Sequence, residues 1–71
     1  MKTLIIDYTN HKGERSERRI VPGGIRHGAT PWHPEAQWLL TAWDVAKQDR
    51  RDFALATIHA MRDGGEVASG T

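Results

Sequence analysis

Residues 38–58 are the most informative part of the sequence and read Trp-Leu-Leu-Thr-Ala-Trp-Asp at 38–44 and Arg-Asp-Phe-Ala-Leu-Ala-Thr-Ile at 51–58. Its Ala, Leu, Gln, Lys and Arg residues are good helix formers, so composition alone allows one or two helices here. As a strand, residues 38–44 would place Trp38 and Trp43 on opposite faces, with leucines on both. That pattern suits a strand buried on both sides.

The residues before this stretch predict a β-hairpin. Residues 3–9 are rich in β-branched and aromatic side chains and lead into Asn-His-Lys-Gly at 10–13, which favours a turn. Residues 15–21 then alternate as a returning strand. Pro-Gly-Gly at 22–24 predicts a kink that turns the chain around the corner of a small barrel. The two prolines within residues 29–35 predict an ordered loop.

The C-terminal part reads as a turn, a strand and a short helix. With residues 38–44 taken as a strand, residues 46–49 form the turn, residues 51–54 the returning strand and residues 55–62 a strand end passing into a short helix. Asp-Gly-Gly at 63–65 marks its stop.

Seventy-one residues allow one small domain, because a chain of this length buries only about 60 % of its unfolded surface. We expect that domain to cover residues 1–62 and a flexible tail to cover residues 63–71. There is no cysteine to form a disulfide or a thiolate zinc site. The first residues also lack the apolar run of a signal peptide or membrane span, so we expect a cytoplasmic protein.

The net charge of +1, from ten basic and nine acidic residues, does not suggest a general polyanion binder. Local charge is more informative. Residues 11–28 carry five lysines and arginines against two glutamates, which leaves +3. We expect any anion site to draw on this segment, although a solvated hairpin face would have the same composition.

Four fragments together resemble the WYL domain of bacterial regulators: Tyr8 with Gly13, Arg18-x-Ile20-x-Pro22, Trp38-x-Leu40-x-Ala42-x-Asp44 and Arg51-x-Phe53-x-Leu55-x-x-Ile58. The resemblance spans residues 4–60, is similar to the short, free-standing members, and favours the strand reading of residues 38–44. The Trp-Tyr-Leu run that names the family has leucine in place of its tyrosine here. The resemblance implies a mainly β fold, a small, strongly bent barrel of the Sm or SH3-like kind with a short C-terminal helix. It also implies a barrel core formed by Trp38, Leu40, Phe53, Leu55 and Ile58.

WYL domains usually follow a winged helix-turn-helix in transcription factors and bind nucleic acid or nucleotide-like ligands through basic residues. The resemblance therefore implies a ligand-sensing module in a regulatory role. Its ligand would be anionic, either single-stranded nucleic acid or a nucleotide.

The candidate ligand-binding residues are Arg18, Arg19, Arg51, Trp32 and Trp43. Arg18 and Arg51 match the family's positions, Arg19 adjoins Arg18, and a guanidinium offers phosphate a planar fork of donors. The alternative role of each arginine is a structural ion pair, for instance with Asp44 or Glu17. Trp32 in its loop and Trp43 on its strand are candidate stacking surfaces for a base.

Other classes of function have little support in the sequence. Four histidines form no short-spaced pair typical of a zinc site, so we expect no metal or other cofactor. Neither Ser16 nor Ser69 lies in a nucleophile-type turn, so we do not expect an enzyme. The alternative function is a protein–protein interaction or assembly module, homodimer included, that docks through a sheet edge and the Trp32 loop.

Overall fold

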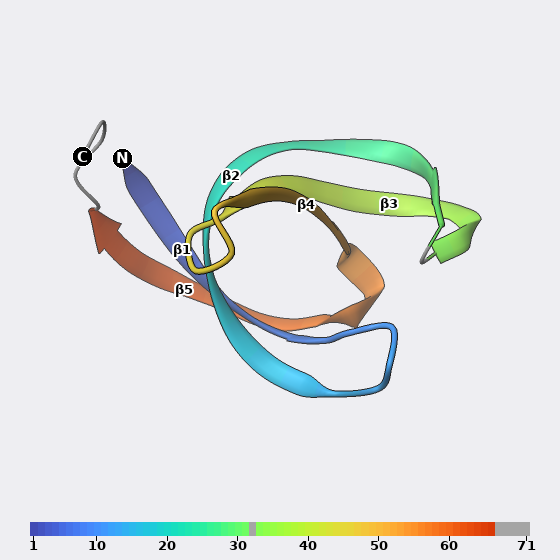
Figure 1. Ribbon diagram of the computed structural model, residues 1–71, viewed down its shortest axis with the longest axis horizontal. Helices are drawn as coiled ribbons and strands as arrows, with labels where there is room; N and C mark the ends of the chain where they lie inside the picture. The colour runs from blue at the N-terminus through green and yellow to red at the C-terminus, as the bar shows by residue number, and fades with distance from the viewer. Residues whose placement is uncertain (32, 67–71) are drawn as a thin grey trace.

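The chain folds into five strands, and the computed structural model describes residues 1–31 and 33–66, the side chain of His33 excepted. The strands are β1 (Lys2–Thr9), β2 (Arg15–Thr30), β3 (His33–Asp44), β4 (Asp49–Ala54) and β5 (Ile58–Glu66), with one 3-10 turn, η1 (Leu55–Thr57), between β4 and β5. They form one sheet in the order β4-β3-β2-β1-β5, with every pairing antiparallel (Figure 1). The prediction of a mainly β fold is confirmed.

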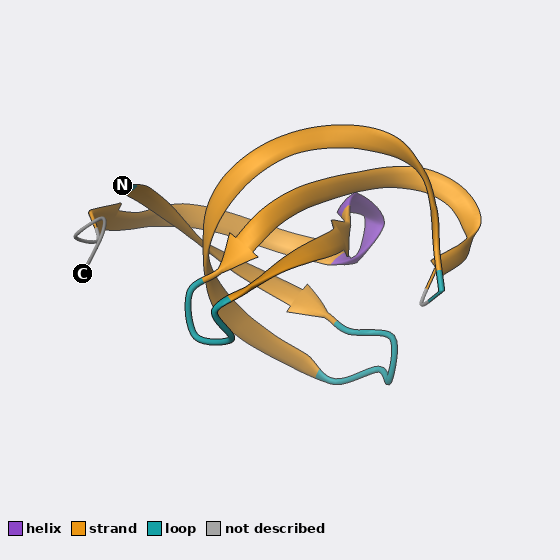
Figure 2. Ribbon diagram, turned by 45° about the horizontal axis from the view of Figure 1, so that its top comes forward, coloured by secondary structure: helices purple, strands orange, loops and turns teal. Residues whose placement is uncertain are grey.

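Strand β2 takes part in both halves of the sheet. The part up to Ile20 pairs with β1, and the part from Ile20 onward pairs with β3. Between Pro22 and Gly24 its register with β3 shifts, and the strand curves strongly (Figure 2). A Cβ on Gly23 would lie 2.8 Å from the carbonyl oxygen of Thr41, so the predicted kink is a bulge that requires glycine.

This curvature brings the side chains of β1 against those of β3 and β4. The resulting core contains Ile6, Tyr8, Ile20, Leu40, Ala42 and Phe53. The rings of Tyr8 and Phe53 meet edge to face with centroids 5.0 Å apart, an arrangement that adds about 0.5–1.5 kcal/mol beyond area burial. Leu55 and Ile58 pack against this core at its margin.

The sheet is bent but not closed into the barrel that the sequence predicted. Strands β4 and β5 are its two edges, and no backbone pairing joins them within the described residues. The three residues of η1 carry the chain from one edge to the other. Each edge strand therefore keeps one side of its backbone outside the ladder.

The short helix predicted within residues 55–62 is wrong. Within residues 1–31 and 33–66 only η1 is helical, and β5 begins at Ile58. Strand β5 pairs with β1, with Met61 opposite Ile6, so the sheet supplies partners for its backbone groups. This pairing between segments far apart in sequence outweighs the helix propensity of the alanines and leucines.

Two segments predicted as a loop and a tail are partly strand. Strands β2 and β3 both extend into residues 29–35, so the predicted loop is mostly the end of a hairpin. Strand β5 extends to Glu66 and includes the start of the predicted tail at 63–71. The rest of that tail, residues 67–71, lies outside the described residues.

Trp38 does not belong to the core, contrary to the prediction. Its side chain is 57 % exposed and lies edge-on to His27, with ring centroids 5.1 Å apart. The pairing of β2 with β1 reaches only as far as Ile20, whereas Trp38 lies opposite His27. The outer part of the β2–β3 hairpin therefore extends past the layer that would cover this indole.

The division of β2 into a buried and an exposed part predicts unequal effects of one substitution. Ile20→Val should lower the free energy of unfolding by about 0.5–1.5 kcal/mol, because Ile20 is fully buried. Ile25→Val, at a side chain that is 61 % exposed, should change it by less than about 0.5 kcal/mol. Urea unfolding followed by circular dichroism checks both, and equal effects would contradict the position of the core.

Candidate functional site

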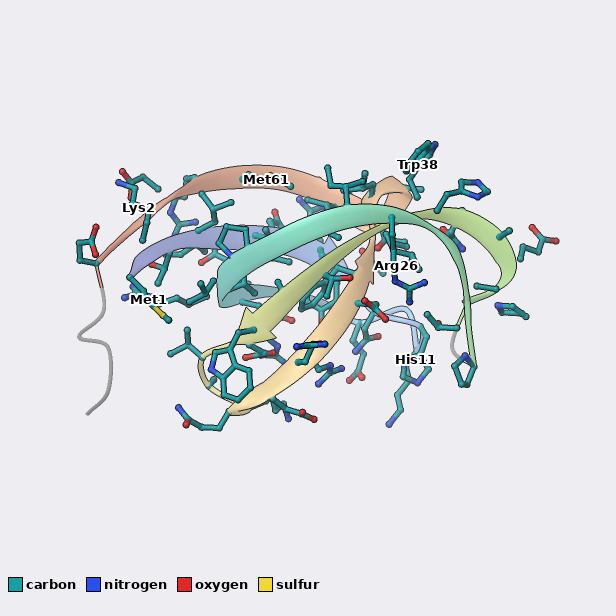
Figure 3. All side chains as sticks on the ribbon, turned by 90° about the horizontal axis from the view of Figure 1, so that it is seen from above. Met1, Lys2, His11, Arg26, Trp38 and Met61 are labelled. Atoms are coloured by element: carbon teal, nitrogen blue, oxygen red, sulfur yellow. The ribbon has the colours of Figure 1, made fainter. Side chains whose placement is uncertain are left out.

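A cleft of about 560 Å³ lies along the edge strand β4 and is called here the β4 cleft. Strand β4 forms one wall, the β1–β2 turn and the tip of the β2–β3 hairpin form the others, and η1 contributes Thr57. The lining residues are Tyr8, Thr9, Asn10, His11, Arg26, Ala29, Thr30, Pro31, Asp49, Arg50, Arg51, Asp52, Phe53, Ala54 and Thr57. Figure 3 shows Arg26 extending toward the side on which His11 lies, while Trp38 points the opposite way.

Strand β4 supplies both signs of charge to this cleft through Asp49, Arg50, Arg51 and Asp52. The lining includes consecutive residues of β4, whose side chains lie on opposite faces of the strand, so the cleft extends around this edge of the sheet. The guanidinium groups of Arg50 and Arg51 form no hydrogen bond or ion pair with any residue that the structure describes. With Arg26, three cations face two carboxylates, a surplus of one positive charge before His11 is counted.

The third arginine of the cleft has a fixed partner. Arg26 Nη2 donates a hydrogen bond of 2.9 Å to Asp52 Oδ2, and Thr41 Oγ1 donates one of 2.7 Å to Asp52 Oδ1. Partial burial favours the protonated form of Asp52, but the hydrogen bonds from Thr41 and Arg26 outweigh it and lower the pKa of this carboxyl. Asp52 therefore stays ionised at neutral pH and holds Arg26.

Arg18, a predicted ligand-binding residue, lies against Asp44 outside the β4 cleft. Its Nε is 3.8 Å from Asp44 Oδ2, and both atoms are buried without a hydrogen bond in the structure. Asp44 is fully buried, and its Oδ1 accepts hydrogen bonds from the backbone N–H groups of Ala46 and Lys47. This position corresponds to the alternative role considered for Arg18, a structural ion pair with Asp44.

Arg19 lies on the other face of β2. Neighbouring residues of a strand point to opposite faces, and Arg18 lies opposite the buried Ile6 whereas Arg19 lies opposite Ile5. Its side chain is exposed and does not line the β4 cleft. Of the three predicted arginines, only Arg51 lines the cleft, so the structure does not bring them together.

Trp43, one of the two predicted tryptophans, does not line the β4 cleft. Trp43 is 44 % exposed on β3, opposite Val21 on one side and Arg50 on the other. Trp32 lies outside the described residues. Tyr8 and Phe53 do line the cleft, but both are buried core residues with little ring surface for stacking.

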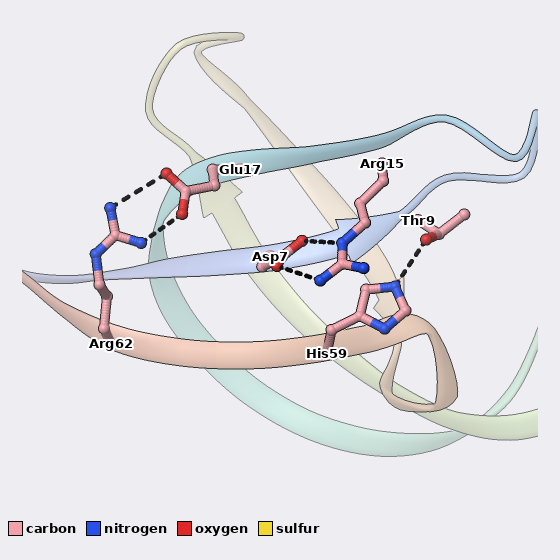
Figure 4. A network of polar contacts seen from close by, with 6 residues as sticks. All are labelled: Asp7, Thr9, Arg15, Glu17, His59 and Arg62. Atoms are coloured by element: carbon pink, nitrogen blue, oxygen red, sulfur yellow. Dashed lines mark hydrogen bonds and ion pairs between the residues drawn. The ribbon is translucent and has the colours of Figure 1, made fainter.

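A second set of charges occupies the sheet face opposite the core (Figure 4). Arg15 donates two hydrogen bonds to Asp7, at 2.9 and 2.8 Å, and Arg62 forms a similar pair of bonds with Glu17. The hydrogen bonds from Arg15 lower the pKa of Asp7, and those from Arg62 lower the pKa of Glu17. These carboxylates pair with arginines on their own face of the sheet and form no ion pair with Arg50 or Arg51 among the described residues.

Sequence reasoning missed Arg26, Arg50 and the turn residues Asn10 and His11 as cleft residues. Arg26 belongs to the basic segment 11–28, from which we expected an anion site to draw, but it was not among the residues named as ligand-binding. The sequence signal for Arg50 is its place in the charged run of residues 49–52. The approach of the β1–β2 turn to β4 depends on the bend of β2. Pro-Gly-Gly at 22–24 signals that bend but does not show which elements it brings together.

Two general properties follow for residues 1–31 and 33–66. They contain no group of three or more His, Asp or Glu side chains arranged to hold a metal ion. They also contain no helix with the length and apolar character needed to cross a membrane.

Comparison with known proteins found no match of this chain to any family model, to any curated protein or to any solved structure.

The burial of Asp44 predicts a structural role for this carboxylate. Asp44→Ala should lower the free energy of unfolding by about 1–3 kcal/mol, because the N–H groups of Ala46 and Lys47 lose their acceptor. Asp49→Ala is the matched control, since Asp49 lies opposite Asp44 and its Oδ1 accepts a hydrogen bond from the Arg50 N–H at an exposed position, where water can replace it. Its effect should stay below about 0.5 kcal/mol in urea unfolding. Equal losses would show that Asp44 does not support the turn.

The pair of Arg15 with Asp7 predicts a shift in titration. Because the pKa of Asp7 is lowered in the folded state, its contribution to stability is present above its unfolded pKa of about 3.9 and is lost as the pH falls through the folded pKa. Arg15→Gln should raise the pKa of Asp7 toward its ordinary value, as measured by NMR titration of the carboxyl carbon. Arg62→Gln should act mainly on Glu17 instead. An unchanged Asp7 titration in Arg15→Gln would contradict the pairing.

Proposed function

We propose that this domain binds a phosphate-bearing ligand, a nucleotide or single-stranded nucleic acid, in the β4 cleft and does so without catalysis. The observation that carries the proposal is the pair of guanidinium groups, Arg50 and Arg51, that line the cleft and form no ion pair or hydrogen bond with a carboxylate among the described residues, although the charge of Arg50 acts on Asp52. A guanidinium presents several N–H donors in a plane and suits the oxygens of phosphate.

The shape and charge of the cleft support this ligand class. Its volume of about 560 Å³ falls within the usual range of small-molecule sites, roughly 300–1,000 Å³. The charge surplus favours an anion. Because Tyr8 and Phe53 are buried, the cleft offers cations for a phosphate but little aromatic surface for a base. Recognition would therefore rest on the phosphate, with limited dependence on the identity of the base.

The resemblance to WYL domains points the same way. We propose that the bent five-stranded sheet is a WYL-like member of the Sm or SH3-like folds, acting in the cytoplasm in a regulatory role. Arg51 carries the ligand in this proposal, because it matches a family position and lines the cleft. Arg18 instead supports the β3–β4 turn through Asp44.

A second candidate function is a protein-docking module. It is favoured by the open edges of β4 and β5 and by the exposed side chains of Ile25 and Trp38. A partner chain could add a strand to either edge, a common mode of peptide recognition. The two candidates differ in salt dependence, because phosphate binding weakens steeply with salt and apolar docking does not.

The phosphate-binding proposal predicts different outcomes for two arginine variants of equal charge. In NMR titrations of labelled protein with AMP and hexathymidylate at low salt, Arg51→Ala should weaken binding about tenfold or more. The reason is that a hydrogen bond to a charged group contributes about 1.5–3 kcal/mol. Arg19→Ala should change the affinity less than about threefold, since Arg19 is exposed outside the cleft.

Higher salt should weaken binding of the oligonucleotide by the wild-type protein, with log K falling by about 0.7 per phosphate contact for each unit of log salt. Equal losses in Arg19→Ala and Arg51→Ala would indicate diffuse charge attraction in place of a site. No shift with either probe at low salt would overturn the proposal and favour protein docking.

A further inference from the structure

Arg26 differs from the other arginines of the β4 cleft in how its side chain is positioned. Its guanidinium lies over the backbone of Gly28, two residues along β2, and a Cβ at Gly28 would be 2.8 Å from Arg26 Nη1. Real Cβ atoms essentially never approach a neighbour so closely. The observed place of the guanidinium therefore requires glycine at position 28.

The same guanidinium is fixed from the other side by β4. Arg26 Nη2 bonds to Asp52, and the second oxygen of Asp52 is occupied by Thr41 on β3, the strand between them. One carboxylate oxygen of Asp52 thus binds Arg26, and the other binds Thr41, which fixes the orientation of the carboxylate. The pair is only partly exposed, at 49 % for the Arg26 side chain and 27 % for Asp52.

We propose that Arg26 is the orienting residue of the β4 cleft, a guanidinium placed in advance by Gly28, Asp52 and Thr41 to receive the phosphate that Arg50 and Arg51 attract. This inference rests on the proposed function. Asp52 uses one of the five N–H donors of Arg26, and no other described residue forms a hydrogen bond with this guanidinium, so the remaining donors can serve a ligand. Since the side chain is already ordered, binding costs less conformational entropy here than at a free arginine.

Gly28 provides a test that leaves every charge in place. Gly28→Ala is compatible with the backbone, because Gly28 does not have a positive φ. The clash involves only the end of a flexible side chain, so the guanidinium must move while the strand remains. Gly24→Ala is the matched control on the same strand, where an added Cβ meets nothing within 4 Å and φ is not positive.

The experiment measures the affinity for AMP and hexathymidylate by NMR titration in wild type, Gly28→Ala, Gly24→Ala and Arg26→Ala. Gly28→Ala should weaken binding at least fivefold and reproduce most of the loss in Arg26→Ala, while Gly24→Ala stays within twofold of wild type. In the Arg26→Ala background, Gly28→Ala should add nothing, because both act through one side chain. An additive effect, or a Gly28→Ala variant that binds like Gly24→Ala, would overturn the inference.

A second readout needs no ligand. The heteronuclear NOE of the Arg26 Nε–H group should show an ordered side chain in the free wild type and a mobile one in Gly28→Ala and Asp52→Asn. Arg19 serves as the exposed reference. If Arg26 is as mobile as Arg19 in the free wild type, the proposal that Arg26 is ordered before binding is wrong, even if the ligand binds. Failure of wild type to bind either probe would refute the proposed function itself, and the ligand role of Arg26 with it.

Discussion

The bend of β2 is the constraint on which the rest of this structure depends. A single strand of 16 residues serves both halves of one sheet, because β2 pairs with β1 in its first part and with β3 in its second. The close approach of Gly23 to the carbonyl of Thr41 shows that the bend has no room for a side chain. Without the bend, Ile6 and Tyr8 on β1 would not meet Phe53 on β4, and the core would have no second wall.

The position of the β4 cleft follows from the same bend. Because β2 folds the sheet over, the β1–β2 turn approaches the edge strand β4 and the tip of the β2–β3 hairpin. An edge strand exposes side chains from both of its faces as well as one side of its backbone. Consecutive residues such as Arg50 and Arg51, which would be separated on a central strand, can therefore serve one cleft. A fold that closed β4 onto β5 would leave less room for a ligand.

Local pattern predicts the first hairpin and the kink, because hairpin strands show alternating side chains and are joined by turn residues. The strand at residues 38–44 was favoured by the family resemblance. The first hairpin, the kink after Ile20 and the strand at residues 38–44 all appear in the structure. The helix at residues 55–62 was mispredicted because its strand state depends on pairing with β1, about fifty residues away. The burial of Trp38 was mispredicted for a related reason, since strand pattern does not reveal how far a covering layer extends.

The candidate site was predictable only in part. Arg51 was identified through the family resemblance, and strand alternation alone separates Arg18 from Arg19, whatever their closeness in sequence. Arg26 could not be singled out, because its placement depends on Gly28 and on Asp52, 26 residues further along the chain. A glycine two positions from an arginine on a strand is the one local sign of such an arrangement, and it is too common to be decisive.

The distribution of charge explains how a nearly neutral chain can present a cationic cleft. Asp7, Glu17 and Asp63 neutralise Arg15, Arg62 and Lys2 on other parts of the sheet, which leaves the β4 arginines without such partners among the described residues. A net charge of +1 gives weak long-range attraction, so electrostatic steering would add little to the association rate. Selection of a ligand must then occur at short range, where direction and position matter more than total charge. An arginine that is oriented before binding is effective in that regime, because its hydrogen bonds discriminate by geometry.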